Sequence, residues 1–138
     1  MGGFEDALRR AVAEDAELVA AGRREVDAAE ARRAAVRAEN EAALRVFVAS
    51  KATAREPGLQ RWKLRSRRRP WPRSPEVAGW PVRVPDEFGR DEEYIVRHDG
   101  TLLSPVWAED QQERSRLVDV EPVDLGARPL APVLRASA

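Results

Sequence analysis

The fold of this chain is decided by residues 4–55, which read FEDALRRAVAEDAELVAAGRREVDAAEARRAAVRAENEAALRVFVASKATAR. This stretch contains no proline and a single glycine, Gly22. It is dense in Ala, Glu, Arg and Leu, which are strong helix formers. Pro57-Gly58 follows after Glu56, and proline disfavours helix at the residue that precedes it. The sequence therefore predicts one long helix that ends before Pro57.

A helix of about 50 residues is roughly 75 Å long, at about 1.5 Å per residue. The rest of the 138-residue chain is too short to cover one face of such a helix. We therefore expect a partner in a second copy or in another protein. Two alternatives are a hairpin that folds at Ala20-Ala21-Gly22, where glycine can end a helix, and a solvated helix held by charge pairs such as Glu5–Arg9.

A heptad assignment gives the helix an apolar seam. Valines at the a positions favour a two-stranded parallel coiled coil, and Asn40 at an a position is the kind of polar residue that fixes register. Small or charged residues at several d positions bury little area, so the seam is weak. The predicted interface consists of Leu8, Val12, Val19, Val26, Ala29, Val36, Asn40 and Phe47.

The charge is unevenly distributed along the chain, although the formal total is zero. Residues 1–50 carry 8 basic and 10 acidic side chains, residues 51–73 carry 9 and 1, and residues 74–138 carry 7 and 13. A basic segment therefore stands between a nearly neutral helix and an acidic C-terminal half. This asymmetry is more informative about partners than the total charge.

The basic segment also contains aromatic residues. Alternation places Trp62 and Leu64 on one face of a predicted strand and the basic side chains on the other. Clustered guanidinium groups bind phosphates and aromatic rings stack on exposed bases, which suggests a nucleic-acid site. Alternatives are ion pairs with acidic residues of the same chain, an acidic protein partner, or an anionic membrane surface. The candidate residues are Arg61, Trp62, Lys63, Arg65, Arg67, Arg68, Arg69, Trp71 and Arg73.

Residues 76–125 have the pattern of a small β module. Trp80, Val82 and Val84 alternate with polar or proline positions, and the prolines favour an edge strand. His98-Asp99-Gly100 lies between two β-rich runs and predicts a tight hairpin turn. Residues 126–138 are expected to form an extended tail. The expected core consists of Trp80, Tyr94, Val96, Trp107, Val118 and Val120.

The predicted fold class is α+β, with one long N-terminal helix followed by a small antiparallel β-sheet or partly open barrel. Residues 1–56 form the helix for oligomerisation or docking, residues 57–75 form a connector with a possible first strand, and residues 76–125 form the β module. So small a core is marginal on its own, which favours packing against the helix or another subunit.

The sequence contains no recognisable catalytic or metal-binding motif. It has no cysteine, and its one histidine, His98, falls in the predicted turn. Asp91-Glu92-Glu93 lacks the spacing of a calcium loop and is interpreted as a solvated acidic loop. We therefore expect neither an enzyme nor a cofactor.

The location of the protein is expected to be the cytoplasm or the interior of a larger assembly. No run of about 18 apolar residues predicts a membrane span, and the N-terminus lacks the apolar stretch of a signal peptide. The preference for Arg over Lys, which occurs only at Lys51 and Lys63, suggests a GC-rich bacterial or phage genome.

These features favour a non-enzymatic structural or adaptor protein that assembles through its long helix, such as a subunit of a phage or other bacterial assembly. Its expected partners are further copies of itself or other protein subunits. The alternative is a nucleic-acid-binding protein that uses residues 61–73.

Overall fold

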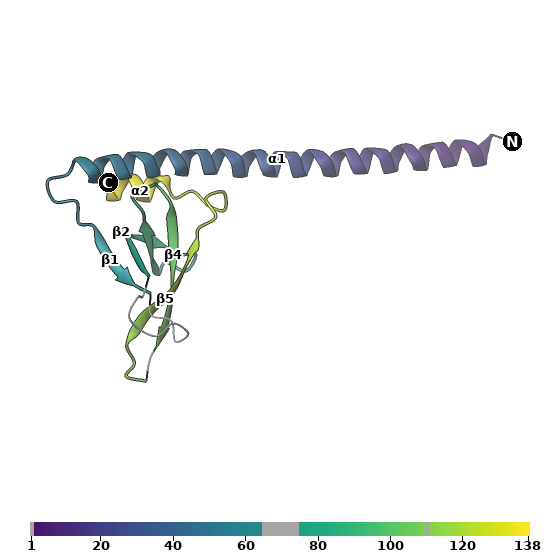
Figure 1. Cartoon of the computed structure of the whole chain (residues 1–138). Helices are drawn as coiled ribbons and strands as arrows, with labels where there is room; N and C mark the ends of the chain where they lie inside the picture. Colours follow the sequence, from purple (N-terminus) through teal and green to yellow (C-terminus); the bar gives the residue numbers. More distant parts are fainter. Residues whose placement is uncertain (1, 65–74, 110) are drawn as a thin grey trace.

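The structure is a computed structural model that describes residues 2–64, 75–109 and 111–138. It consists of one long N-terminal helix, five antiparallel strands in an open sheet, and a short C-terminal helix (Figure 1). The predicted α+β class is therefore confirmed. The long helix crosses one end of the sheet, and its N-terminal part projects far beyond it (Figure 1).

The long helix, α1, spans Gly3–Thr53 without interruption. It passes through Gly22, so the chain does not form the hairpin considered as an alternative. Ala54 has extended backbone dihedral angles, and the Thr53 hydroxyl donates to the carbonyl oxygens of Ala49 and Ser50. The helix thus ends before Pro57, where the sequence predicted its end.

The strands are β1 (Gln60–Lys63), β2 (Glu76–Pro85), β3 (Asp91–Val96), β4 (Leu102–Glu109) and β5 (Ser115–Pro122). They lie in the order β1-β2-β3-β4-β5, and each pairs antiparallel with its neighbour. The predicted turn joins β3 to β4. Gly100 has a φ of 84° there, and the Asp99 carboxylate accepts a hydrogen bond from the Thr101 amide at 3.0 Å.

Strand β2 has two halves with different partners. Residues 76–79 pair with β1, whereas residues 80–85 pair with β3. Gly79 lies at the junction, where a β-carbon would be 2.5 Å from the Val96 carbonyl oxygen. Pro81 and Pro85 fall in the half that β1 does not reach, where a missing amide proton costs no ladder bond. The edge strand was predicted for residues 80–85, and these residues pair with β3 on one side only among the described strands, so the prediction is confirmed for them.

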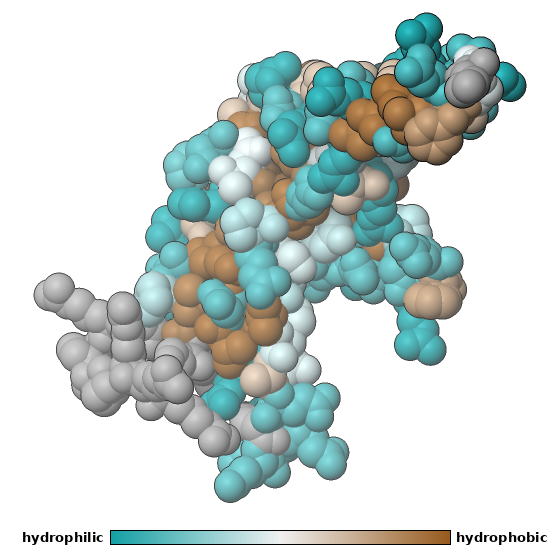
Figure 2. All heavy atoms as spheres, turned by 90° about the vertical axis from the view of Figure 1, so that its right-hand side faces the viewer, coloured by the Kyte–Doolittle hydropathy of each residue, from teal (hydrophilic) through white to brown (hydrophobic). Residues whose placement is uncertain are grey.

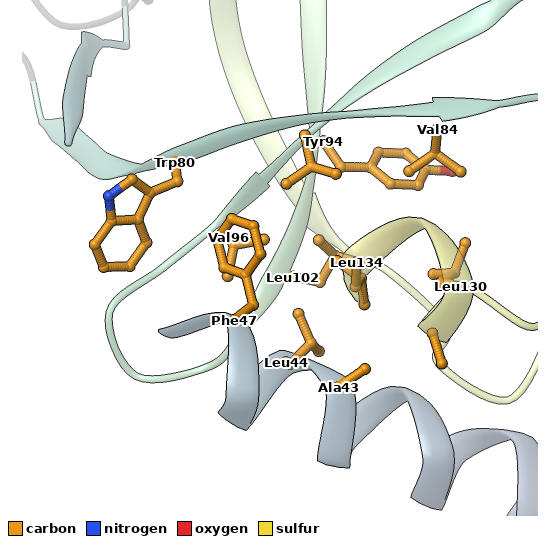
Figure 3. Packing of buried hydrophobic residues seen from close by; sticks show 12 residues of the cluster. Ala43, Leu44, Phe47, Trp80, Val84, Tyr94, Val96, Leu102, Leu130 and Leu134 are labelled. Atoms are coloured by element: carbon orange, nitrogen blue, oxygen red, sulfur yellow. The ribbon is translucent and has the colours of Figure 1, made fainter. Parts of the chain in front are cut away.

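The second helix, α2, spans Ala131–Ser137 and lies between α1 and the sheet (Figures 1 and 3). The expected extended tail is therefore wrong for these residues. Leu130 and Leu134 are fully buried, and proline at the start of α2 suits the first helical turn. Burial of these leucines against α1 and the sheet stabilises a helix too short to form alone.

The main core lies between α1, α2 and one face of the sheet (Figure 3). The ring of Phe47 from α1 meets Trp80 of β2 edge-on, with centroids 6.2 Å apart. The buried residues are Ala43, Leu44, Phe47, Trp80, Val82, Val84, Tyr94, Val96, Leu102, Leu130, Ala131 and Leu134. The predicted core positions Trp80, Tyr94 and Val96 are thus confirmed.

A smaller cluster covers the opposite face of the sheet. Val77, Ile95 and Leu103 are buried there, and Trp62 and Leu64 pack against them. This arrangement confirms that Trp62 and Leu64 share one face.

Two other expectations about the core need correction. Trp107 is 44% exposed, so its predicted burial is wrong. The pairing of β4 with β5 shifts register between Val106 and Trp107, which changes the alternation of side chains at that point. Val118 and Val120 are only half-buried, although Val120 packs against the smaller cluster.

Asn40 joins α1 to the C-terminal segment through four hydrogen bonds. Its side-chain amide nitrogen donates to the carbonyl oxygens of Leu125 and Arg128, at 2.8 and 2.9 Å. Its side-chain oxygen accepts from the backbone amides of Leu130 and Ala131, at 2.8 and 3.0 Å. These bonds use the full capacity of an asparagine side chain. Since Leu130 and Ala131 begin α2, Asn40 also satisfies the amides at that helix start.

Replacing Asn40 with Ala removes all four bonds and leaves buried backbone groups without partners. Each such group costs about 1–3 kcal/mol, so we expect the free energy of unfolding to fall by about 3 kcal/mol or more. Urea denaturation followed by tryptophan fluorescence measures this loss. Glu39→Ala, at an exposed neighbouring position of α1, is the matched control and should change stability by less than about 0.5 kcal/mol.

Gly79→Ala should destabilise the sheet, because the added methyl group meets the carbonyl oxygen of Val96 at the β2–β3 junction. Overpacking of this kind costs typically about 1–3 kcal/mol. Gly3→Ala is the control, since no heavy atom lies within 4 Å of the added carbon. Equal stability of the two variants in thermal denaturation would contradict the close approach at Gly79.

Candidate interaction surfaces

The N-terminal part of α1 makes no core contacts. Among residues 2–39 no side chain is buried, and burial begins at Asn40. The nearest attachment before Asn40 is at Asp124, whose carboxylate forms ion pairs with Arg33 and, at 3.8 Å, with Arg37. The hydrogen bond from Arg33 lowers the pKa of Asp124. We call residues 3–32 the free arm.

Large apolar side chains lie exposed along the free arm. Phe4 is 80% exposed and Leu18 is 71% exposed, and the others are Leu8, Val12, Val19 and Val26. Figure 2, which views α1 from its N-terminal end, shows hydrophobic atoms gathered along the helix beside hydrophilic ones. We call these six residues the apolar stripe.

The apolar stripe lies on the same side of α1 as the face that packs on the sheet and α2. Phe4 precedes Asn40 by 36 residues, which is about ten full turns of helix. Leu8, Leu18 and Val26 fall within about 40° of the same direction at 3.6 residues per turn, and Val12 and Val19 lie farther to one side. The stripe therefore continues the docked face of α1 onto the free arm.

The structure divides the predicted helix interface into two parts. Asn40 and Phe47 are buried against other elements of the same chain, and Ala29 and Val36 are half-buried. Leu8, Val12, Val19 and Val26 belong to the exposed stripe. Asn40 thus binds loop and helix backbone of its own chain, where the sequence suggested a second helix.

A groove lies where β1 approaches the hairpin that joins β4 to β5. It has a volume of about 560 Å³, and the described residues of its lining include two tryptophans and four basic residues but no acidic one. The lining consists of Arg61, Trp62, Lys63, Trp107, Gln112, Arg114, Ser115, Arg116 and Leu117. Residues from the first and last strands of the sheet thus meet at one surface, which we call the basic groove.

The basic residues that line the groove include one, Arg61, that forms an ion pair with a neighbouring strand. Arg61 lies 3.8 Å from the Glu76 carboxylate, and both side chains are largely exposed. The Nε of Arg116 is buried without a hydrogen-bond partner in the described parts of the chain. Trp107 is the more exposed of the two rings. A planar anionic ligand could therefore meet both charge and an aromatic face here.

Only part of the predicted nucleic-acid segment can be placed. Arg61, Trp62 and Lys63 line the basic groove. The other candidates, Arg65, Arg67, Arg68, Arg69, Trp71 and Arg73, lie outside the described residues. The sequence analysis missed Trp107, Arg114 and Arg116. The alternation Arg114-Ser115-Arg116 at the start of β5 is the signal that could have found the last two.

Residues 91–93, interpreted from the sequence as an acidic loop, instead begin strand β3, and Glu92 there is tied to the C-terminal segment. Arg128 donates to the hydroxyl of Tyr94 at 3.1 Å, and that hydroxyl donates to Glu92 at 2.9 Å. Burial is the main cause that raises the pKa of Tyr94. Arg128 also donates to the Pro85 carbonyl oxygen at 2.7 Å. Glu92 thus takes part in a structural network that holds residues 125–130 against the sheet.

Other kinds of site are not evident in the described residues. Outside positions 1, 65–74 and 110, no three His, Cys, Asp or Glu side chains are grouped so that they could hold a metal ion. His98 is exposed in the β3–β4 turn. No helix in the same part of the chain is long and apolar enough to cross a membrane.

Comparisons with known proteins give no relative. No family model matches this sequence, and neither a curated protein nor a solved structure matches it significantly.

Proposed function

We propose that the protein is a non-enzymatic structural or adaptor protein that assembles through its free arm. The observation that carries the proposal is the apolar stripe, which continues the docked face of α1 but is exposed over residues 4–26. A large exposed apolar patch on a soluble protein typically marks an interaction site. We call the sheet together with α2 the head of the molecule. The head packs on the C-terminal part of α1 and so fixes the direction in which the free arm projects.

The energetics favour a reversible association. Full burial of an aliphatic or phenylalanine side chain is worth about 1.5–3 kcal/mol, so six residues give a gross gain on the order of 10 kcal/mol. The loss of translational and rotational freedom on association costs about 4–15 kcal/mol. The gross gain is of the same size as this cost, so we expect any association through the stripe to be weak and reversible.

Replacing Val12 and Val26 together with Glu should abolish association, because it places charge on the apolar stripe. Sedimentation velocity over a range of protein concentrations measures this effect. Val46→Glu is the matched control, because Val46 is 58% exposed and Val26 is 57% exposed. On the helix, Val46 is rotated by about one third of a turn from Asn40, so its side chain points away from the stripe. Association that is equally strong in the double variant would contradict assembly through the arm.

A second candidate function is the binding of single-stranded nucleic acid at the basic groove. The observation that favours it is the convergence of Trp62 and Trp107 with Arg61, Lys63, Arg114 and Arg116 on one surface. Basic side chains bind the phosphate backbone, and tryptophan rings stack on bases with little sequence preference. The two functions are compatible, since assembly would bring several grooves together and raise avidity.

Trp107→Ala should weaken binding of a labelled oligonucleotide by roughly tenfold, because a stacked base is worth about 1–3 kcal/mol. Arg116→Ala should reduce the slope of log affinity against log salt by about 0.7. Fluorescence anisotropy at two salt concentrations measures both effects. Arg135→Ala removes an exposed charge on α2, away from the groove lining, and should leave binding unchanged. The absence of binding at low salt would exclude this function.

A further inference from the structure

We propose that the free arms of two copies pair antiparallel, so that the two heads lie at opposite ends of the dimer. This inference rests on the proposed assembly function and adds the identity and direction of the partner. It follows from the position of the head on α1.

The head blocks the stripe's face of α1 beyond the free arm. Contacts with Asp124 begin at Arg33, and Asn40, Leu44 and Phe47 are buried under α2 and the sheet. A partner helix on the stripe is therefore stopped at about residue 32. In a parallel pair, the two heads would lie at the same height along the helices, each on the side that faces the partner. Each head would then overlap with the partner's helix.

The antiparallel direction removes this conflict. The arm spans 30 residues from 3 to 32, or about 45 Å of helix. With residue 17 near a two-fold axis, the N-terminus of each arm reaches about residue 31 of the other, just before the partner's head. Each head then lies beyond the N-terminal end of the other helix. The free arm of one chain is thus covered along its length by the free arm of the second.

One pair of stripe residues meets in this direction, since Leu8 of one chain faces Val26 of the partner. Leu18 lies next to the axis, and Phe4 and Val19 come opposite Glu30 and Asp15 of the partner. Val12 faces Gly22 of the partner, where the missing side chain leaves room for the valine. Glycine within a helix costs about 1 kcal/mol relative to Ala, and close approach at this layer offsets that cost.

A second copy suits the arm because it supplies a surface of equal length and the same apolar character. Such a pair uses the same patch on both chains, and its two-fold symmetry closes it as a dimer. The interface is also continuous with the one that already holds α1 to the head.

Cysteine crosslinking tests the direction directly, because the chain contains no cysteine. We would prepare Leu8→Cys, Leu18→Cys and Val26→Cys as separate full-length proteins and oxidise them alone or mixed. A disulfide requires α-carbons about 4.4–6.8 Å apart. We expect Leu8→Cys to crosslink with Val26→Cys in the mixture, and neither to crosslink when alone. Leu18→Cys, near the axis, should crosslink alone through a short bis-maleimide.

Val46→Cys mixed with Leu8→Cys is the negative control for random collision. Crosslinking of Leu8→Cys and of Val26→Cys each with itself would overturn the antiparallel direction, while assembly through the arm would stand. Sedimentation as a monomer at every concentration, with no crosslink above the control, would overturn self-pairing, while docking of the free arm on a different protein would stand. The proposal would be supported by two results together. The mixed crosslink should form, and the separate variant with both Val12→Glu and Val26→Glu should no longer dimerise.

Discussion

The four hydrogen bonds of Asn40 are the interaction on which the rest of the structure depends. A buried amide with every donor and acceptor satisfied tolerates one arrangement of its partners and penalises others. Because those partners are backbone groups between Leu125 and Ala131, the bonds fix the position of the last loop and the start of α2 against α1. Burial of Leu44, Phe47 and Leu134 stabilises the contact between α1 and α2, whereas the Asn40 amide fixes the position of α2 along α1.

This anchoring leaves α1 with two unequal parts. The C-terminal part, from Arg33 onward, is held by the head, and the free arm carries the same apolar face into solvent. The same sequence pattern thus serves an internal contact in one place and an exposed stripe in another. The difference is whether other elements of the chain cover the helix at that position. The head covers α1 only from Arg33 onward, because it is too small to extend over the free arm.

Much of the fold could be predicted from local sequence. The absence of proline over residues 4–55, the alternation around Trp80 and Val82, and the Asp99-Gly100 turn each act over a few residues. Long-range effects were missed. Nothing near Leu130 in sequence indicates a surface that would stabilise a seven-residue helix, and nothing near Trp107 indicates the register shift that exposes it. The apolar seam of the helix could be seen in the sequence. Its pattern did not indicate that Asn40 binds backbone groups 85–91 residues away. Likewise, the basic groove joins the first and last strands, and although the basic residues of both strands alternate in the sequence, local pattern could not show that they lie side by side.

The long separation between Asn40 and its partners also sets the order of folding. A helix forms in about a microsecond or less, whereas contacts between residues so far apart must first close a long loop. During that interval, the docked face of α1 and the apolar stripe are exposed together as one continuous surface. Closure of the Asn40 contacts then covers the docked face, so that of this surface only the apolar stripe stays exposed on α1.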